Sequence, residues 1–203
     1  MPGTTIRSKS LRALIRASTT RIVDSKGTFV SSSPTIKSPR LAFYNIDQGR
    51  WDGLVSEDRK ALEGLFGAAH LSAAGVPDCD VLFLYCTIEQ TGKIAASPLG
   101  LGEIIRDSGA KIVVVAAPNP GKHYIAARQR APYGRANIVM TVDRFGEAFP
   151  RFFSRLFAQM FEGVSMPVAW VTLSPQVPEG FGGEEDNPET VFACELGQMA
   201  FRR

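Results

Sequence analysis

Three long apolar runs constrain the fold of this chain more than any other feature of its sequence. They read "DVLFLYC" at residues 80–86, "KIVVVAA" at 111–117 and "ANIVMTV" at 136–142. A strand that is buried on both faces of a sheet shows such a continuous run instead of an alternation of apolar and polar residues. The intervals between the runs are long enough for the crossover helices that parallel strands require. The sequence therefore predicts an α/β fold, a three-layer sandwich with a mostly parallel central sheet and helices on both faces.

Three further segments have the composition of strands. "LAFYNI" at 41–46 precedes the runs, "VAWVTL" at 168–173 is expected to be a fourth central strand, and "TVFACEL" at 190–196 the last strand. We expect the central strands to point in the same direction. Their trailing loops then gather along one edge of the sheet, where ligands bind in open α/β folds.

The spacing of apolar residues predicts the helices. Ser56, which two acidic residues follow, has the character of a helix start, because negative charge is favourable at a helix N-terminus. A stripe at helical spacing then runs over 62–69 and places His70 late in that helix. A stronger aromatic stripe runs over 149–161, and its composition indicates core packing rather than a cofactor site.

The first 40 residues are predicted to form a basic N-terminal arm, and residues 41–203 a single α/β domain. Within the arm, 21–30 has the pattern of a hairpin and 31–40, rich in serine and proline, that of a linker. Residues 1–23 carry five basic side chains and no acidic one, which also fits a transit peptide or a nucleic-acid arm. A loose terminus or a short packed helix is the simpler interpretation.

Composition narrows the function classes. A formal net charge of +3 is too small to indicate nucleic-acid binding, and no stretch reaches the ~20 apolar residues of a membrane helix. The three cysteines show neither metal-ligand spacing nor a disulfide framework, so we expect no metal site and a reducing, cytoplasmic location. No cofactor motif is intact, so no cofactor is predicted. The partner is expected to be a protein or a small molecule, and self-association stays open.

Cys86, His123 and Asp143 follow successive predicted strands and form the candidate catalytic set. A neighbouring imidazole activates a thiol by lowering its pKa, and a carboxylate orients the imidazole. The three residue types in this order therefore suggest a cysteine-dependent hydrolase. The competing interpretation is that Cys86 simply packs in the core, since cysteine is among the most buried residue types.

A second set at the same edge suggests phosphate or nucleotide binding. The loop "APNPGKHY" at 117–124 follows an apolar run, where backbone N–H groups and a lysine favour an anion. It lacks the first glycine and the final hydroxyl residue of a phosphate-binding P-loop. The candidate ligand-binding residues are Thr87, Asn119, Gly121, Lys122 and Arg144.

The same strand ends resemble those of the CHAT domains, relatives of the caspase-type cysteine peptidases. The family pattern is an apolar strand ending in Cys-His-Gly, a helix, a strand ending in Ala-Cys-x-x-Gly, then a strand, a helix and a tail entering G-x-S. Here "FLYCTI" is similar to the first strand, "VVVAAPNPG" to the second, and "ANIVMTVDRFGEAFPRFFSRLFAQMFEGVSMPVAW" to the remainder. The resemblance covers roughly residues 78 to 170.

The departures from this pattern determine what the resemblance implies. Thr87 occupies the position of the catalytic histidine, and Pro118 that of the nucleophilic cysteine. These side chains supply no thiolate–imidazole pair, so the resemblance excludes peptidase activity by the family mechanism and makes Cys86 a packing residue. Because fold and activity separate readily, we expect a non-catalytic binding or interaction module resembling a degenerate CHAT domain. A hydrolase using Cys86 and His123, or a phosphate binder, is the alternative.

Overall fold

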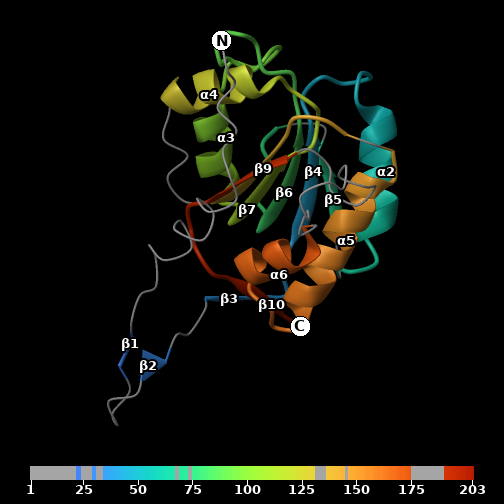
Figure 1. Ribbon diagram of the computed structural model, residues 1–203. Helices are drawn as coiled ribbons and strands as arrows, with labels where there is room; N and C mark the ends of the chain where they lie inside the picture. The colour runs from blue at the N-terminus through green and yellow to red at the C-terminus, as the bar shows by residue number, and fades with distance from the viewer. Residues whose placement is uncertain are drawn as a thin grey trace, which may run out of the picture.

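The computed structural model describes residues 22–23, 29–30, 34–66, 69–72, 75–130, 136–144, 146–174 and 190–203. It confirms the predicted α/β architecture, with a mostly parallel sheet between two layers of helices (Figure 1). In spatial order the strands of the main sheet are β5 (Ala69–Ser72), β4 (Leu41–Asn45), β6 (Val81–Tyr85), β7 (Ile112–Val115), β8 (Asn137–Thr141) and β9 (Thr190–Cys194). The first five strands in this order run parallel to one another, and β9 runs antiparallel to β8.

Alternate side chains of the central strands point to opposite faces, and each face has its own core. On one face they pack against α2 (Asp52–Leu62), α5 (Ala148–Phe161) and α6 (Met166–Leu173). On the other face they pack against α3 (Leu101–Ser108) and α4 (Gly121–Arg130). The apolar runs are therefore continuous because both sides of each strand are covered.

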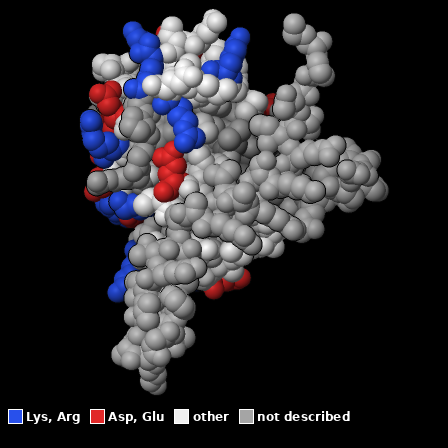
Figure 2. Space-filling model, turned by 60° about the vertical axis from the view of Figure 1, so that its left-hand side comes forward, with Lys and Arg blue, Asp and Glu red and all other residues white. Residues whose placement is uncertain are grey.

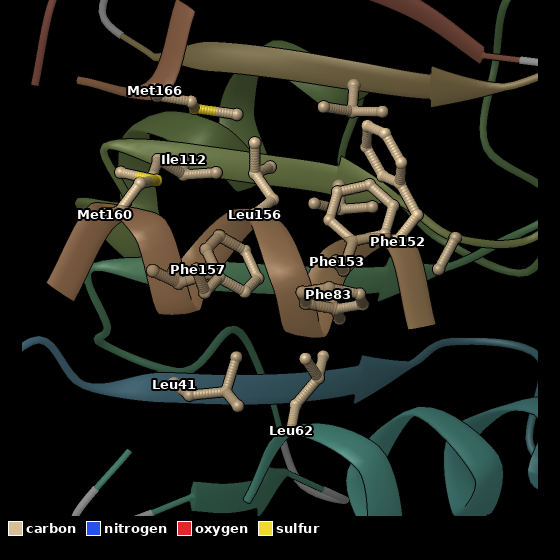
Figure 3. Packing of buried hydrophobic residues seen from close by; sticks show 14 of the residues in the cluster. Leu41, Leu62, Phe83, Ile112, Phe152, Phe153, Leu156, Phe157, Met160 and Met166 are labelled. Atoms are coloured by element: carbon tan, nitrogen blue, oxygen red, sulfur yellow. The ribbon is translucent and has the colours of Figure 1, made fainter. Parts of the chain in front are cut away.

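The aromatic stripe of α5 lies in the first of these cores, which confirms its predicted packing role (Figure 3). The rings of Phe153 and Phe83 meet edge to face with centroids 5.4 Å apart. Phe152 lies against Trp170 of α6 in the same way, at 4.9 Å. Such pairs add roughly 0.5–1.5 kcal/mol each beyond the area that they bury.

The predicted fourth central strand at 168–173 is wrong, because this segment belongs to α6. Ser165 is extended at the N-cap position, and Pro167 lies in the first turn, where its missing N–H is not needed. A short apolar run does not distinguish a buried strand from a buried helix by its periodicity. The place in the sheet is taken by β4, so four neighbouring central strands, β4, β6, β7 and β8, still run parallel.

The first helix of the domain also differs from the prediction. It begins at Asp52 instead of Ser56, which lies exposed inside α2, and it ends at Leu62. The acidic residue in the first turn of the helix is Asp52, whereas the sequence predicts the two acidic residues after Ser56 in that role. His70 is not helical but lies in edge strand β5, paired with Ala42. The apolar stripe continued past the helix because Leu65 and Phe66 pack on the same core.

Short strands lie outside the main sheet. At the segments expected to form a hairpin, β1 (Ile22–Val23) pairs antiparallel with β2 (Phe29–Val30). Within the expected linker, β3 (Thr35–Lys37) pairs parallel with β10 (Ala200–Arg202). Among the helices that the structure describes, none is both long and apolar enough to cross a lipid bilayer.

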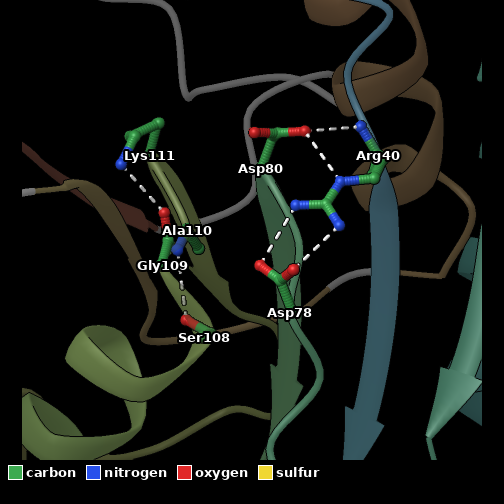
Figure 4. Close-up of polar contacts among 7 residues, drawn as sticks. All are labelled: Arg40, Asp78, Asp80, Ser108, Gly109, Ala110 and Lys111. Carbon is green, nitrogen blue, oxygen red and sulfur yellow. Dashed lines mark hydrogen bonds and ion pairs between the residues drawn. The ribbon is translucent and has the colours of Figure 1, made fainter.

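The amino edge of the sheet is held by one exposed polar cluster (Figure 4). The Arg40 guanidinium donates to both carboxylate oxygens of Asp78, at 3.0 and 3.1 Å, and to Asp80 at 3.4 Å. The Arg40 ion pair holds the pKa of Asp78 below its ordinary value. This cluster joins the starts of β4 and β6.

Candidate functional site

A pocket of about 480 Å³ lies at the carboxyl edge of the sheet, on the face that α2 covers. The start of α2 forms one wall, and the segments that follow β7 and β8 form the other. It combines an aromatic ring, aliphatic surface and charged groups of both signs. The lining residues are Arg50, Trp51, Gly53, Leu54, Glu57, Pro118, Arg144 and Gly146.

One rim of the pocket is organised by the Asp47 carboxylate, which follows β4. Its Oδ2 atom accepts hydrogen bonds from the Thr87 backbone N–H at 2.9 Å, the Thr87 hydroxyl, and the Trp51 indole Nε1 at 3.2 Å. Arg50 donates from Nη1 to the Thr87 Oγ1 at 3.1 Å, and its guanidinium lies 4.7 Å from the centre of the Trp51 ring. The hydroxyl of Thr87 is therefore already used as both donor and acceptor.

The floor of the pocket is a buried ionic network. Arg144 binds Asp58 through two hydrogen bonds, Nη1 to Oδ2 at 2.8 Å and Nη2 to Oδ1 at 2.7 Å. Tyr85 donates to the same carboxylate at 2.6 Å, and Glu57 lies 3.4 Å from Nη2 of Arg144. The Arg144 guanidinium also lies 4.3 Å from the centre of the Phe149 ring. These contacts fix the segment that follows β8 against α2.

Burial dominates the electrostatics of this network. The side chains of Asp58 and Arg144 are 0% and 3% exposed. Burial raises the pKa of Asp58, although the hydrogen bonds and charge of Arg144 oppose the rise. Burial together with the Asp58 charge raises the pKa of Tyr85 well above its ordinary value. The Nε of Arg144 is buried and has no hydrogen-bond partner among the described residues.

The predicted ligand residue Asn119 has a different task. Its Oδ1 accepts the Ile88 backbone N–H at 2.7 Å, and its Nδ2 donates to the carbonyls of Cys86 and Ala117 at 3.0 Å each. The side chain is buried, and it joins the loops that follow β6 and β7. Because backbone groups use both ends of the amide, Asn119 offers nothing to an anion.

The candidate catalytic residues lie in separate surroundings. Cys86 is fully buried in the core on the α3/α4 side, and burial raises the pKa of its thiol. His123 donates from Nδ1 to the Ile88 carbonyl at 2.7 Å, and the exposed Asp143 accepts the Arg144 backbone N–H at 2.7 Å. Among the described residues no hydrogen bond joins these three side chains. This geometry lends no support to a thiolate–imidazole pair.

The remaining predicted ligand residues divide between the two faces of the sheet. Gly121 and the exposed Lys122 begin α4. Arg144 lies in the pocket on the α2 side, but its charge is compensated by Asp58. Thr87 follows β6, and its backbone N–H donates a hydrogen bond to the Asp47 carboxylate. The structure therefore does not gather the predicted anion-binding set around one point.

Apart from Arg144, the predicted ligand residues do not include those that line the pocket. Asp47, Arg50 and Trp51 stand in "DQGRW", directly after a predicted strand, and that position was the available signal. Asp58 was assigned to a helix start, and Tyr85 to the strand core. Nothing local indicated that Asp58 binds Arg144.

Comparisons with known proteins give no neighbour. A scan against protein-family models, a search of curated proteins and a search of solved structures all return no match.

Proposed function

We propose that this protein is a non-catalytic module that binds a peptide segment in the pocket at the carboxyl edge of its sheet. The observation that carries the proposal is the contrast between an open pocket and inert neighbouring groups. The pocket offers Trp51, Leu54 and Pro118 as apolar surface with Arg50 and Glu57 beside them. The Cys86 thiol is buried on the other face of the sheet, and the Thr87 hydroxyl beside the pocket is already engaged in hydrogen bonds.

A peptide suits this combination of groups. Ligand pockets are mostly apolar, with a few polar groups that fix orientation. Arg50 is exposed and lies over the Trp51 ring, and Glu57 of the same pocket is about half exposed. A peptide that carries an apolar side chain between two polar groups can contact the Trp51 ring and pair with both Arg50 and Glu57. The Arg144–Asp58 pair already holds the floor of the pocket in place, so binding a peptide costs less ordering of the protein.

The resemblance to a degenerate CHAT domain is part of the proposal. The order of elements over the similar stretch is β6, α3, β7, α4, β8 and α5, which agrees with that pattern except that α4 stands between its second and third strands. Pro118, at the position of the family's nucleophile, lines the pocket, and Thr87, at the position of its histidine, contacts the pocket residue Arg50. We further propose a cytoplasmic location, which the free thiols of all three cysteines support.

Fluorine NMR tests the proposal directly, because the chain contains only two tryptophans. Trp51 lines the pocket, and Trp170, which is buried on the inner side of α6, serves as an internal control. With 5-fluorotryptophan labelling, pools of capped tetrapeptides should shift the Trp51 resonance and leave Trp170 unchanged. Leu54→Arg should abolish the shift by filling the pocket, whereas Ile125→Arg on α4 should not. Equal movement of both resonances, or no response to any pool, would refute peptide binding here.

A further inference from the structure

The outer face of α4 carries a regular arrangement of charge that the pocket does not explain. Lys122, Ile125 and Arg128 follow one another at three-residue spacing, so they lie along one side of the helix. All three are exposed, and Ile125, with 62% of its surface accessible, is the most exposed large apolar residue that the structure describes. The result is an apolar side chain with a cation one turn away on each side.

The charge on this face is only partly balanced by neighbouring acidic residues. α4 contains no acidic residue. Lys122 lies in its first turn, where a positive charge opposes the helix dipole, and no described residue forms an ion pair with it. Arg128 has one partner, Glu195, at 3.4 Å. Figure 2 turns the side of the molecule with α3 and α4 toward the viewer and shows Lys and Arg side chains near the top, where α4 lies in Figure 1, with Asp and Glu side chains close below them.

The position of α4 is fixed by contacts that do not involve Lys122, Ile125 or Arg128. The loop 88–94 packs so closely below it that a Cβ on Gly92 would lie 2.4 Å from the Ala126 backbone. Tyr124 donates from its hydroxyl to the Thr141 carbonyl at 2.8 Å, and Arg130 donates to the Thr91 carbonyl. A rigid helix presents its outer side chains to a partner at little ordering cost.

We infer that this face, Lys122–Ile125–Arg128, is a docking surface for an acidic amphipathic segment of a partner protein. A segment with one large apolar side chain, and a carboxylate one helical turn to each side, matches the face in both charge and spacing. Nucleic acid fits less well, because phosphates leave the central Ile125 without an apolar partner. A lipid surface would need a wider apolar face than one isoleucine provides.

A defined peptide tests the inference. A fluorescein-labelled peptide with two copies of Glu-Ala-Ala-Leu-Ala-Ala-Glu should bind the full chain, as measured by anisotropy, and should bind more weakly as salt rises. Lys122→Glu with Arg128→Glu should weaken binding by about tenfold or more, since like charges then face each other. Ile125→Asp should weaken it as well.

Controls separate this surface from the pocket and from general charge effects. Lys37→Glu with Lys60→Glu makes the same change in net charge elsewhere and should leave binding unchanged, as should Leu54→Arg in the pocket. Circular dichroism confirms that each variant is folded. The inference is overturned if a peptide with leucine moved next to glutamate binds equally, if the α4 variants bind normally, or if single-stranded DNA or anionic vesicles bind in preference to the peptide.

Discussion

Arg144 and Asp58 form a bidentate ion pair, with contacts of 2.7 and 2.8 Å, although 86 residues separate them along the chain. The pair joins α2 to the segment between β8 and α5, and both side chains are almost completely buried. It therefore forms the floor of the pocket and also ties α2 to the carboxyl end of the sheet.

Removing one member of this pair should destabilise the protein strongly. Asp58→Asn leaves the buried Arg144 charge with only the half-exposed Glu57 as a counterion, and we expect a loss of roughly 3–5 kcal/mol in the free energy of unfolding. Urea denaturation followed by circular dichroism measures it. A triple change, Asp58→Leu with Arg144→Met and Tyr85→Phe, removes all three buried polar groups of the network together. This variant should recover most of the lost stability. A loss below about 1 kcal/mol for Asp58→Asn, the scale of an exposed pair, would contradict buried pairing.

The three thiols should react in an order set by burial. Cys194 is exposed, whereas Cys79 and Cys86 are buried, and burial raises the pKa of Cys79 to about 12. Iodoacetamide at pH 8 should therefore label Cys194 first and reach the other two only after denaturant is added, as read by peptide mass mapping. Faster labelling of Cys86 than of Cys194 would instead restore the case for a nucleophile.

The elements that the sequence revealed are those whose local pattern matches their environment. The apolar runs at β6, β7 and β8 are covered on both faces, so their composition carried the signal. The composition of the segment at 168–173 did not indicate its helix, because valine and tryptophan suit a strand. The proline at 167 was the only local sign of a helix start.

The sequence predicted the location of the candidate site and one of its lining residues, Arg144. The carboxyl edge followed from strand direction, and the pocket lies there. Its chemistry depends on pairs such as Arg144 with Asp58, which no short window of sequence contains. Asn119 shows the converse, because a polar residue after a strand is equally suited to bonding the backbone of neighbouring loops.

Stability should fall in alkaline solution through Tyr85. Its pKa is raised in the folded state, so the folded protein keeps the proton while the unfolded chain loses it above about pH 10. The stabilisation is complete below that pH and is lost as the pH rises through the folded-state pKa. Tyr85→Phe should cost about 1 kcal/mol at pH 7, and its deficit should shrink at pH 11. Tyr44→Phe, on the other face, is the control. A deficit that stays constant with pH would contradict the raised pKa.

Gly92 should be the least replaceable of the described glycines. It has a positive φ of 80°, and an added Cβ would lie 2.4 Å from backbone atoms of Ala126 and Ala127 in α4. Because helix backbone does not yield as a side chain does, Gly92→Ala should cost about 2 kcal/mol or more in thermal or urea unfolding. Gly49→Ala separates the two causes, since Gly49 shares the positive φ, at 86°, but faces open space. Equal losses for the two variants would show that backbone conformation, and not the close approach of α4, explains the effect.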